Sequence, residues 1–309
     1  MEEMRRGEIK PLSVHLAVDG SEHSLAAARL IRELPLPPGS EVVVLSVLTP
    51  RYSPGRSVLM AASDQVRELL EDSGYAIKHG LLHGHPAEEL TNFAYREPPD
   101  LISVGAKGLN ATLGILLGGV AQQLVEYSRW PVLVTRAPFT GLRRILLVTD
   151  GSIYSRVAVD YLAHFPLPAE SEVVVMHVLP PAASLQTNIL GELAGRGRMP
   201  DVAGAEIEEA AARQAETEER DGQAILAEAT QTLQAAGVKA SSLLARGDAT
   251  GEILEFARQN DTDLIVAGSR GLSRVKGWLM GSVSRKLVYH AGCSVLIVKP
   301  NHETAGAVE

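Results

Sequence analysis

The residues best suited to chemistry form a motif of glycines and serines towards the C-terminal end of the sequence. It comprises Gly268-Ser269-Arg270-Gly271, nine further residues, then Gly281-Ser282, with Ser284 two residues on. Glycines leave backbone N–H groups uncovered and let an anion approach closely. A hydroxyl just after the last glycine either caps a helix or donates to a phosphate oxygen. The motif predicts a phosphate site or, more simply, a turn with a capped helix.

Apolar segments on both sides of this motif predict the elements that position it. Asp263 to Ala267 and Ser294 to Val298 are short, mainly apolar runs typical of buried strands. Between Gly281 and the second run, Val283, Leu287, Val288 and Ala291 recur at helical spacing. The predicted order is strand, glycine-rich loop, helix N-terminus, strand.

The same arrangement occurs a second time, earlier in the chain. Gly105-Ala106-Lys107-Gly108, nine residues and Gly118-Gly119 repeat the spacing at an offset of 163 (268 − 105). Gly119 stands where the later copy has Ser282, and Ala121 where it has Ser284. The second copy therefore keeps the hydroxyls, and the first has lost them.

Upstream landmarks repeat as well, at a different offset. Asp19-Gly20-Ser21 matches Asp150-Gly151-Ser152, and the apolar run Glu41 to Leu48 matches Glu172 to Leu179, each 131 apart (150 − 19). The offset grows by 32 (163 − 131), which indicates an insertion at about 180–212 in the second copy. We therefore expect a duplicated domain, with copies at 1–137 and 141–300 and a C-terminal tail at 301–309.

Within each copy, predicted strands alternate with predicted helices. In the first copy we expect strands at 12–18, 41–48 and 76–82, and helices after Ser21, at 59–73 and from His85 to before Pro98. In the second, the helix that follows the insertion is expected at about 206–236 with a solvated charged face. Strands that alternate with helices predict right-handed crossovers and a parallel sheet.

Ligands of a parallel sheet bind beyond the carboxyl ends of its strands. Asp19 and Asp150 follow the first strand of each copy, so each reaches the edge that also carries the glycine loop. A carboxylate there suits hydrogen bonding to a base or ribose, or holding a divalent cation beside phosphates. The alternative is that Asp-Gly-Ser only caps the following helix.

Composition and charge narrow the function classes. The 309 residues are 45% hydrophobic and 21% charged, which is typical of a globular protein with a real core. The net charge of −8 argues against a nucleic-acid surface. Cys293 is the single cysteine and fits a reducing compartment, and no signal peptide is apparent, so we expect a cytoplasmic protein. The uncharged stretch 108–125 coincides with the first glycine loop, so we expect no membrane span.

Several familiar sites are missing from the sequence. There is neither a Gly-x-x-x-x-Gly-Lys-Ser/Thr loop nor a Gly-x-Gly-x-x-Gly after the first strand, which argues against a P-loop NTPase and a dinucleotide-dependent dehydrogenase. No Cys/His cluster has metal-site spacing, and His83 and His85 are expected to be exposed in a turn. No Ser, His and Asp stand in register as an activated nucleophile.

Together these motifs resemble the universal stress protein family in its tandem two-domain form. The resemblance rests on Val-Thr-Asp-Gly-Ser at 148–152, Val-Met-His-Val at 175–178, Gly-x2-Gly-x9-Gly-Ser at 268–282 and Ser-Val-Leu-Ile-Val at 294–298. It covers about Ser13 to Pro300 apart from the insertion. It implies an α/β fold with two open five-stranded parallel sheets, strand order 3-2-1-4-5 and helices on both faces. It also implies that the last strands, at Val132–Val134 and Val295–Ile297, pair the copies as an intrachain pseudo-dimer.

The resemblance further implies binding of ATP, alone or together with Mg²⁺, where the motif is complete. Carried over by position, Asp150 and the backbone of Val178 would hold adenine and ribose, and the glycine–serine motif would hold phosphates. The implied site residues of the second copy are Thr149, Asp150, Val178, Ala267, Gly268, Arg270, Gly271, Gly281, Ser282, Val283 and Ser284. Those of the first copy, where the lost hydroxyls argue against tight binding, are Asp19, Val47, Gly105, Gly108 and Gly118.

The leading hypothesis is an ATP-binding stress-response regulator that is not an enzyme, with the nucleotide held mainly by the second copy. A rival hypothesis is a nucleotide-independent interaction module that uses the pseudo-dimer surface and the 180–236 arm. A true hydrolase is the weakest reading, because no general base stands beside the predicted phosphates. Beyond an adenine nucleotide, the expected partners are a second copy of the chain or a regulatory protein, and neither nucleic acid nor a membrane.

Overall fold

We describe a computed structural model of the chain, in which residues 10–49, 55–109, 116–181, 204–271 and 280–300 are described. Side chains of 204–208 are outside this description, and so is most of the predicted insertion. The elements of the first half are β1 (Ser13–Ala17), α1 (Glu22–Glu33), β2 (Glu41–Leu48), α2 (Arg56–Leu70), a 3₁₀ turn (Glu71–Ser73), β3 (Ala76–His83), α3 (Pro86–Arg96), β4 (Leu101–Gly105), α4 (Gly119–Tyr127) and β5 (Val132–Thr135).

The second half repeats this order. Its elements are β6 (Arg144–Val148), α5 (Ile153–His164), β7 (Glu172–Leu179), α7 (Gly204–Ala235), β8 (Lys239–Arg246), α8 (Ala249–Gln259), β9 (Leu264–Gly268), α9 (Ser282–His290) and β10 (Ser294–Val298). The predicted strand and helix types are confirmed throughout. α2 begins at Arg56 rather than Leu59, because Gly55 starts it without a side-chain cap that the sequence could have revealed.

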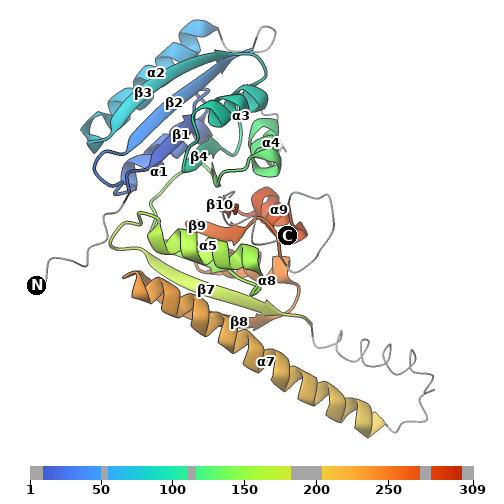
Figure 1. Ribbon diagram of the computed structural model, residues 1–309. Helices are drawn as coiled ribbons and strands as arrows, with labels where there is room; N and C mark the ends of the chain where they lie inside the picture. Colours follow the sequence, from blue (N-terminus) through green and yellow to red (C-terminus); the bar gives the residue numbers. More distant parts are fainter. Residues whose placement is uncertain (1–9, 50–54, 110–115, 182–203, 272–279, 301–309) are drawn as a thin grey trace, which may run out of the picture.

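All ten strands join one sheet in the order β3-β2-β1-β4-β5-β10-β9-β6-β7-β8. Each half has the predicted 3-2-1-4-5 order with parallel pairing. The halves meet where β5 and β10 pair antiparallel, with Leu133 opposite Leu296. The expected pseudo-dimer within one chain is therefore confirmed, as a single continuous sheet (Figure 1).

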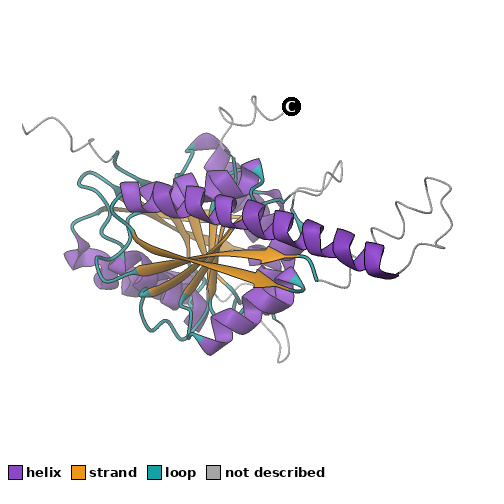
Figure 2. Ribbon diagram, turned by 90° about the horizontal axis from the view of Figure 1, so that it is seen from below, coloured by secondary structure: helices purple, strands orange, loops and turns teal. Residues whose placement is uncertain are grey.

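Helices cover both faces of this sheet (Figure 2). One core lies under α1, α2, α5 and α7, and the other under α3, α4, α8 and α9; each core runs through both halves. Because the central strands are covered on both sides, they are apolar runs rather than alternating ones. β1 is an exception: its His15 is 2% exposed, where the second half has Leu146.

α7 is much longer than its counterpart α2 and projects beyond β7 and β8 (Figure 1). At Gly222 it lies so close to the sheet that an added Cβ would come within 2.9 Å of the Leu244 Cδ1 atom. The preceding residues, 204–221, extend the helix by about 27 Å at 1.5 Å per residue. This agrees with the helix predicted at 206–236.

The uncharged stretch 108–125 is not one helix, since α4 begins only at Gly119. Among the described residues, no helix combines the length and the apolar character that crossing a bilayer requires.

Candidate functional site

The turn after β6 places the Asp150 carboxylate at the carboxyl edge of the sheet. Its Oδ1 accepts a hydrogen bond from the Ser152 backbone N–H at 3.0 Å. Ser152, not Asp150, caps α5, because its side chain accepts from the Ser155 N–H. Asp150 therefore braces its own turn, and the simple capping role considered from the sequence belongs to the serine.

The second carboxylate oxygen of Asp150 lies against the glycine loop. A Cβ added to Gly271 would come only 2.4 Å from Asp150 Oδ2. No side chain fits there without displacing the carboxylate. The structure thus brings the predicted aspartate and the predicted glycine loop together at one edge.

Of the other two glycines of the loop, Gly268 is required by a close approach of backbone, and Gly281 closes the base of the loop. A Cβ on Gly268 would meet the Tyr154 carbonyl oxygen at 2.5 Å, so glycine lets the end of β9 approach the start of α5. Gly281 is the N-cap of α9, and its N–H donates to the Ser269 carbonyl at 2.7 Å. The loop is consequently held closed at its base.

The two serines after the loop have different surroundings. Ser282 is the first residue of α9 and is exposed, but it is not the cap, which is Gly281 without a side-chain hydrogen bond. Ser284 is 6% exposed, and its hydroxyl donates to the Gly268 carbonyl at 2.7 Å. Ser282 is therefore open to solvent at the start of α9, whereas the Ser284 hydroxyl anchors the loop to the helix.

The backbone N–H groups and the positive charge at this edge of the sheet favour the binding of an anion. The first N–H groups of α9 have no carbonyl partner within the helix, and the helix dipole adds partial positive charge there. Arg270 adds a full charge: its guanidinium donates to the Tyr154 hydroxyl at 3.3 Å and lies 5.5 Å from that ring's centroid. Backbone donors and a cation at a helix N-terminus form an arrangement that can bind phosphate.

The end of β7 borders the same edge. β7 runs on past its last pairing with β6, Val148 with Met176. The Met176 carbonyl accepts from Thr149 on the β6 side, and the Leu179 carbonyl accepts from Gly247 on the β8 side. Because successive residues alternate, the peptide groups of Val178 face the space above the end of β6. A ligand beside Asp150 would lie within reach of them.

Three other predicted residues belong to the elements that meet at this edge. Thr149 is buried, and its hydroxyl donates to Ser155 Oγ at 3.1 Å. Ala267 is buried in β9, and Val283 is half-buried in the first turn of α9. The Thr149 hydroxyl is thus already paired, and the Ala267 and Val283 side chains carry no polar group.

The first half has the same geometry with different side chains. Asp19 Oδ1 accepts from Ser21 N–H and Oδ2 from Leu109 N–H, each at 3.0 Å. A Cβ on Gly108 would lie 2.7 Å from Asp19 Oδ2, and one on Gly105 2.7 Å from the His23 backbone. Gly118 caps α4, and Val47 lies near the end of β2. The scaffold is retained, with both Asp19 carboxylate oxygens accepting backbone hydrogen bonds.

The cations and rings near the two loops also differ. His23 takes the place of Tyr154, and Lys107 that of Arg270. Burial and the Lys107 charge lower the pKa of His23, whose Nδ1 accepts from the Ala137 N–H at 2.9 Å. The first half therefore presents a mostly neutral imidazole where the second has a phenol.

Sequence reasoning missed the side chains that hold the end of the first strand in each half. His177 Nδ1 donates to the Thr149 carbonyl at 2.8 Å, and Ser46 Oγ donates to the Val18 carbonyl at 2.9 Å. Both lie on the second strand, 131 residues apart. Both residues are polar and interrupt an otherwise apolar strand, and this pattern could have identified them from the sequence.

The two histidines of the β3–α3 turn, His83 and His85, are both exposed, as predicted. Within the part of the chain that the structure describes, no three His, Cys, Asp or Glu side chains gather as a metal site.

Known proteins with related sequences and folds were found. A model of the universal stress protein family matches residues 13–136 and again 141–299. Universal stress protein YxiE of Bacillus subtilis is 30% identical over 156 residues, covering 50% of this chain and 98% of YxiE. The crystal structure of a universal stress protein from Archaeoglobus fulgidus matches with a TM-score of 0.62 at 18% identity, covering 94% of this chain and 97% of that one. This last likeness concerns the fold alone.

Proposed function

The chain belongs to the universal stress protein family, and from this premise we propose that it is a cytoplasmic, ATP-binding regulator of a stress response. The nucleotide is held mainly by the second half, with domain limits at 1–137 and 141–300. ATP acts as a bound signal, and the protein is not an enzyme.

The observation that carries this proposal is the contact between Asp150 and Gly271 beside the N-terminus of α9. A carboxylate suited to a ribose or base and backbone donors suited to phosphates lie at one edge. A carboxylate beside a phosphate-binding backbone fits a nucleotide better than it fits an isolated inorganic anion.

The roles follow from the positions described above. Asp150 and the Val178 backbone hold the nucleoside, and Gly268, Gly271, Gly281 and Ser282 hold the phosphates with Arg270 as counter-charge. Thr149, Ala267 and Val283 line the site, and Ser284 acts indirectly through the Gly268 carbonyl. In the first half, Asp19, Val47, Gly105, Gly108 and Gly118 form a weaker site.

Mg²⁺ fits this set of groups as a companion of ATP. The oxygen donors at this edge include a carboxylate, Asp150, and a hydroxyl, Ser282, and Mg²⁺ prefers oxygen ligands shared with substrate phosphates. The ion would neutralise phosphate charge when bound.

Hydrolysis is not part of the proposal. The hydroxyls of Thr149, Ser152 and Ser155 bond to one another rather than to an imidazole. Among the described residues, the imidazole of His177 uses Nδ1 to hold the Thr149 carbonyl.

The test is to denature freshly purified full-length protein and identify the released small molecules by mass spectrometry and ion-pair chromatography. We expect ATP or ADP near one equivalent per chain. Two equivalents would show that the first half binds equally well. No released nucleotide, and no binding when ATP and Mg²⁺ are added, would refute the proposal.

A second candidate function is a nucleotide-independent interaction module that uses the pseudo-dimer surface and the 180–236 arm. The projection of α7 beyond β7 and β8 favours it (Figure 1), because a long helix beyond the sheet offers a partner-binding face. A chain that binds no nucleotide but retains a partner through α7 would support this second function.

A further inference from the structure

Two cations at equivalent positions cross the junction between the halves. Arg136 follows β5 and Lys299 follows β10, at the same offset of 163 as the glycine loops. The Arg136 guanidinium donates to the Val288 and Tyr289 carbonyls of α9 at 2.9 and 3.1 Å. The Lys299 ammonium donates to the Ser128 carbonyl, which ends α4. Each half thus supplies a cation to the C-terminal end of the other half's last helix, where it is favourable.

The two cations differ in whether they can lose their charge. Lys299 is 7% exposed, and burial together with the Arg270 charge lowers its pKa to about 7, against a smaller opposing effect of Glu126. The guanidinium of Arg136 stays charged at any physiological pH. Near neutrality, only the second half's cation therefore exchanges a proton.

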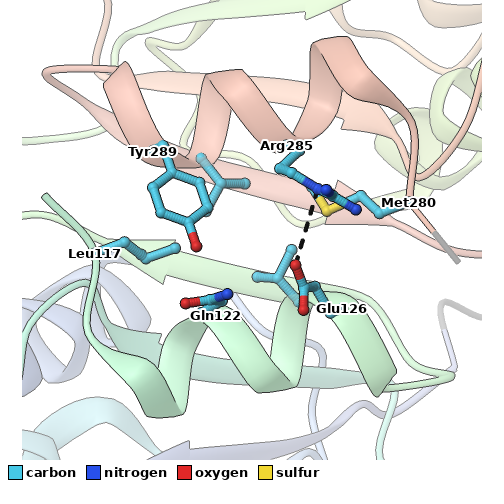
Figure 3. A pocket seen from close by; sticks show the side chains of 8 residues that line it. Leu117, Gln122, Glu126, Met280, Arg285 and Tyr289 are labelled. Atoms are coloured by element: carbon cyan, nitrogen blue, oxygen red, sulfur yellow. Dashed lines mark ion pairs between the residues drawn. The ribbon is translucent and has the colours of Figure 1, made fainter. Parts of the chain in front are cut away.

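Charged groups face Lys299 from two elements. Arg270 belongs to the glycine loop after β9, and Glu126 belongs to α4. Glu126 is itself paired with Arg285 of α9 at 3.8 Å (Figure 3). Of these groups, Arg270 is the one that a ligand at the loop would meet directly.

The backbone also links Lys299 to the loop. The Ser269 N–H donates to the carbonyl of Val298, the residue before Lys299, at 2.8 Å. The Ser269 carbonyl in turn accepts from the Gly281 N–H. The base of the proposed phosphate loop is thus attached to the strand end that carries the lysine.

We propose that Lys299 senses a polyanion at the second-half loop and transmits its presence to the first half: binding draws a proton onto the Lys299 amine and strengthens its bond to the Ser128 carbonyl. This inference rests on the proposed nucleotide site. Phosphates beside Arg270 offset the charge that opposes protonation of the lysine, so the charged form becomes favoured. By reciprocity, protonation of Lys299 tightens nucleotide binding.

The expected size follows from linkage. If phosphate binding raises the pKa of Lys299 from about 7 by roughly one unit, about half a proton is taken up per nucleotide at pH 7.5. The same shift makes binding about eightfold tighter at pH 6 than at pH 9 through this residue. The titration of ATP itself is the same for every variant and cancels in comparisons.

The experiment is isothermal titration calorimetry of Mg²⁺–ATP into the full chain, in pairs of buffers with different ionisation enthalpies. Wild type, Lys299→Arg, Lys299→Met and the matched control Lys286→Met, which removes an exposed lysine of α9, are compared. We expect proton uptake by wild type and Lys286→Met to exceed that of both Lys299 variants by about half a proton. Lys299→Arg keeps a cation at the junction, so it remains informative if the methionine variant unfolds.

Equal proton uptake by wild type and Lys299→Arg, with ATP bound by both, would overturn the role of Lys299 while leaving the nucleotide site intact. Absence of ATP binding to wild type would refute the proposed function, and this inference with it.

Discussion

A substitution of Gly281 by aspartate separates the phosphate role of the glycine loop from its structural role. Gly281 is the N-cap of α9 with φ −71° and ψ 156°, a conformation that any residue adopts. Aspartate is a preferred N-cap residue, and its charge is favourable at a helix N-terminus. An added Cβ would lie 3.3 Å from the Arg270 Cα atom, so the loop must shift by a few tenths of an ångström. We expect the variant to stay folded, within about 1 kcal/mol of wild type.

Binding should respond very differently. A carboxylate at residue 281 would lie roughly 5 Å from a bound phosphate, where two unit charges repel by about 3 kcal/mol at an effective dielectric constant of about 20. That repulsion corresponds to a loss of at least about 100-fold in ATP affinity. Gly281→Asn has nearly the same shape without the charge, so it should keep affinity within about tenfold.

The assay pairs calorimetric titration of ATP with thermal unfolding of the same samples. Gly118→Asp is the matched variant in the first half, because Gly118 caps α4 with similar angles, φ −74° and ψ 149°. It should leave the second-half affinity unchanged. A folded Gly281→Asp protein that binds ATP as tightly as wild type would refute the placement of phosphates at this helix.

Three further predictions concern individual side chains. Burial lowers the pKa of His15 from 6.5 to about 4, so the folded protein favours the neutral imidazole. The free energy of unfolding should therefore fall by up to about 3 kcal/mol as the pH drops from 6.5 to 4. The His15→Leu variant should lack this loss of stability. Denaturant unfolding of both proteins at pH 7 and pH 4.5 measures this loss, and an equal loss in wild type and His15→Leu would contradict the prediction. Ser284→Ala should cost about 1 kcal/mol of stability and less than tenfold in ATP affinity, since its hydroxyl holds the Gly268 carbonyl; a large affinity loss at unchanged stability would place the hydroxyl on the ligand instead. Gly268→Ala should lower the free energy of unfolding by about 1–3 kcal/mol or more, because its Cβ would meet the Tyr154 backbone. Gly292→Ala has open space around it and should not lower the free energy of unfolding. Equal stabilities of the two variants would contradict the prediction and show that α5 can move away from β9 at little cost.

The fold was predictable because the sequence patterns that indicate each strand, turn and loop are local and occur twice in the chain. Apolar runs, proline turns and glycine loops recur at fixed offsets, so each half supports the reading of the other. His15 shows where this reasoning fails. The alternation of residues 12–18 is typical of a strand with one solvated face, yet β1 lies in the middle of its half of the sheet and is covered on both sides. Only the strand order reveals that burial.

The candidate site was predictable in its backbone but not in its connections. Glycine spacing located the loop, and the position of Asp150 after the first strand of its half located the carboxylate, which the structure places against Gly271. The anchoring role of Ser284 was not foreseen, because a serine in the first turn of a helix looks the same whether it faces a ligand or a carbonyl. The bond from Lys299 to Ser128 joins residues 171 apart, and no local pattern signals such a contact.

The side chains at the junction complement each other only when a first half meets a second half. Across the pseudo-two-fold axis, Glu126 of α4 faces Arg285 of α9, and Gln122 lies towards Tyr289 (Figure 3). By the offset of 163, Gln122 corresponds to Arg285 and Glu126 to Tyr289. Pairing two first halves would place Glu126 opposite Gln122, and pairing two second halves would place Arg285 opposite Tyr289. Either arrangement leaves partly buried charges without a counter-ion, which is costly, so the interface favours one copy of each half. A half with the complete glycine–serine motif is thereby held against a half without the hydroxyls.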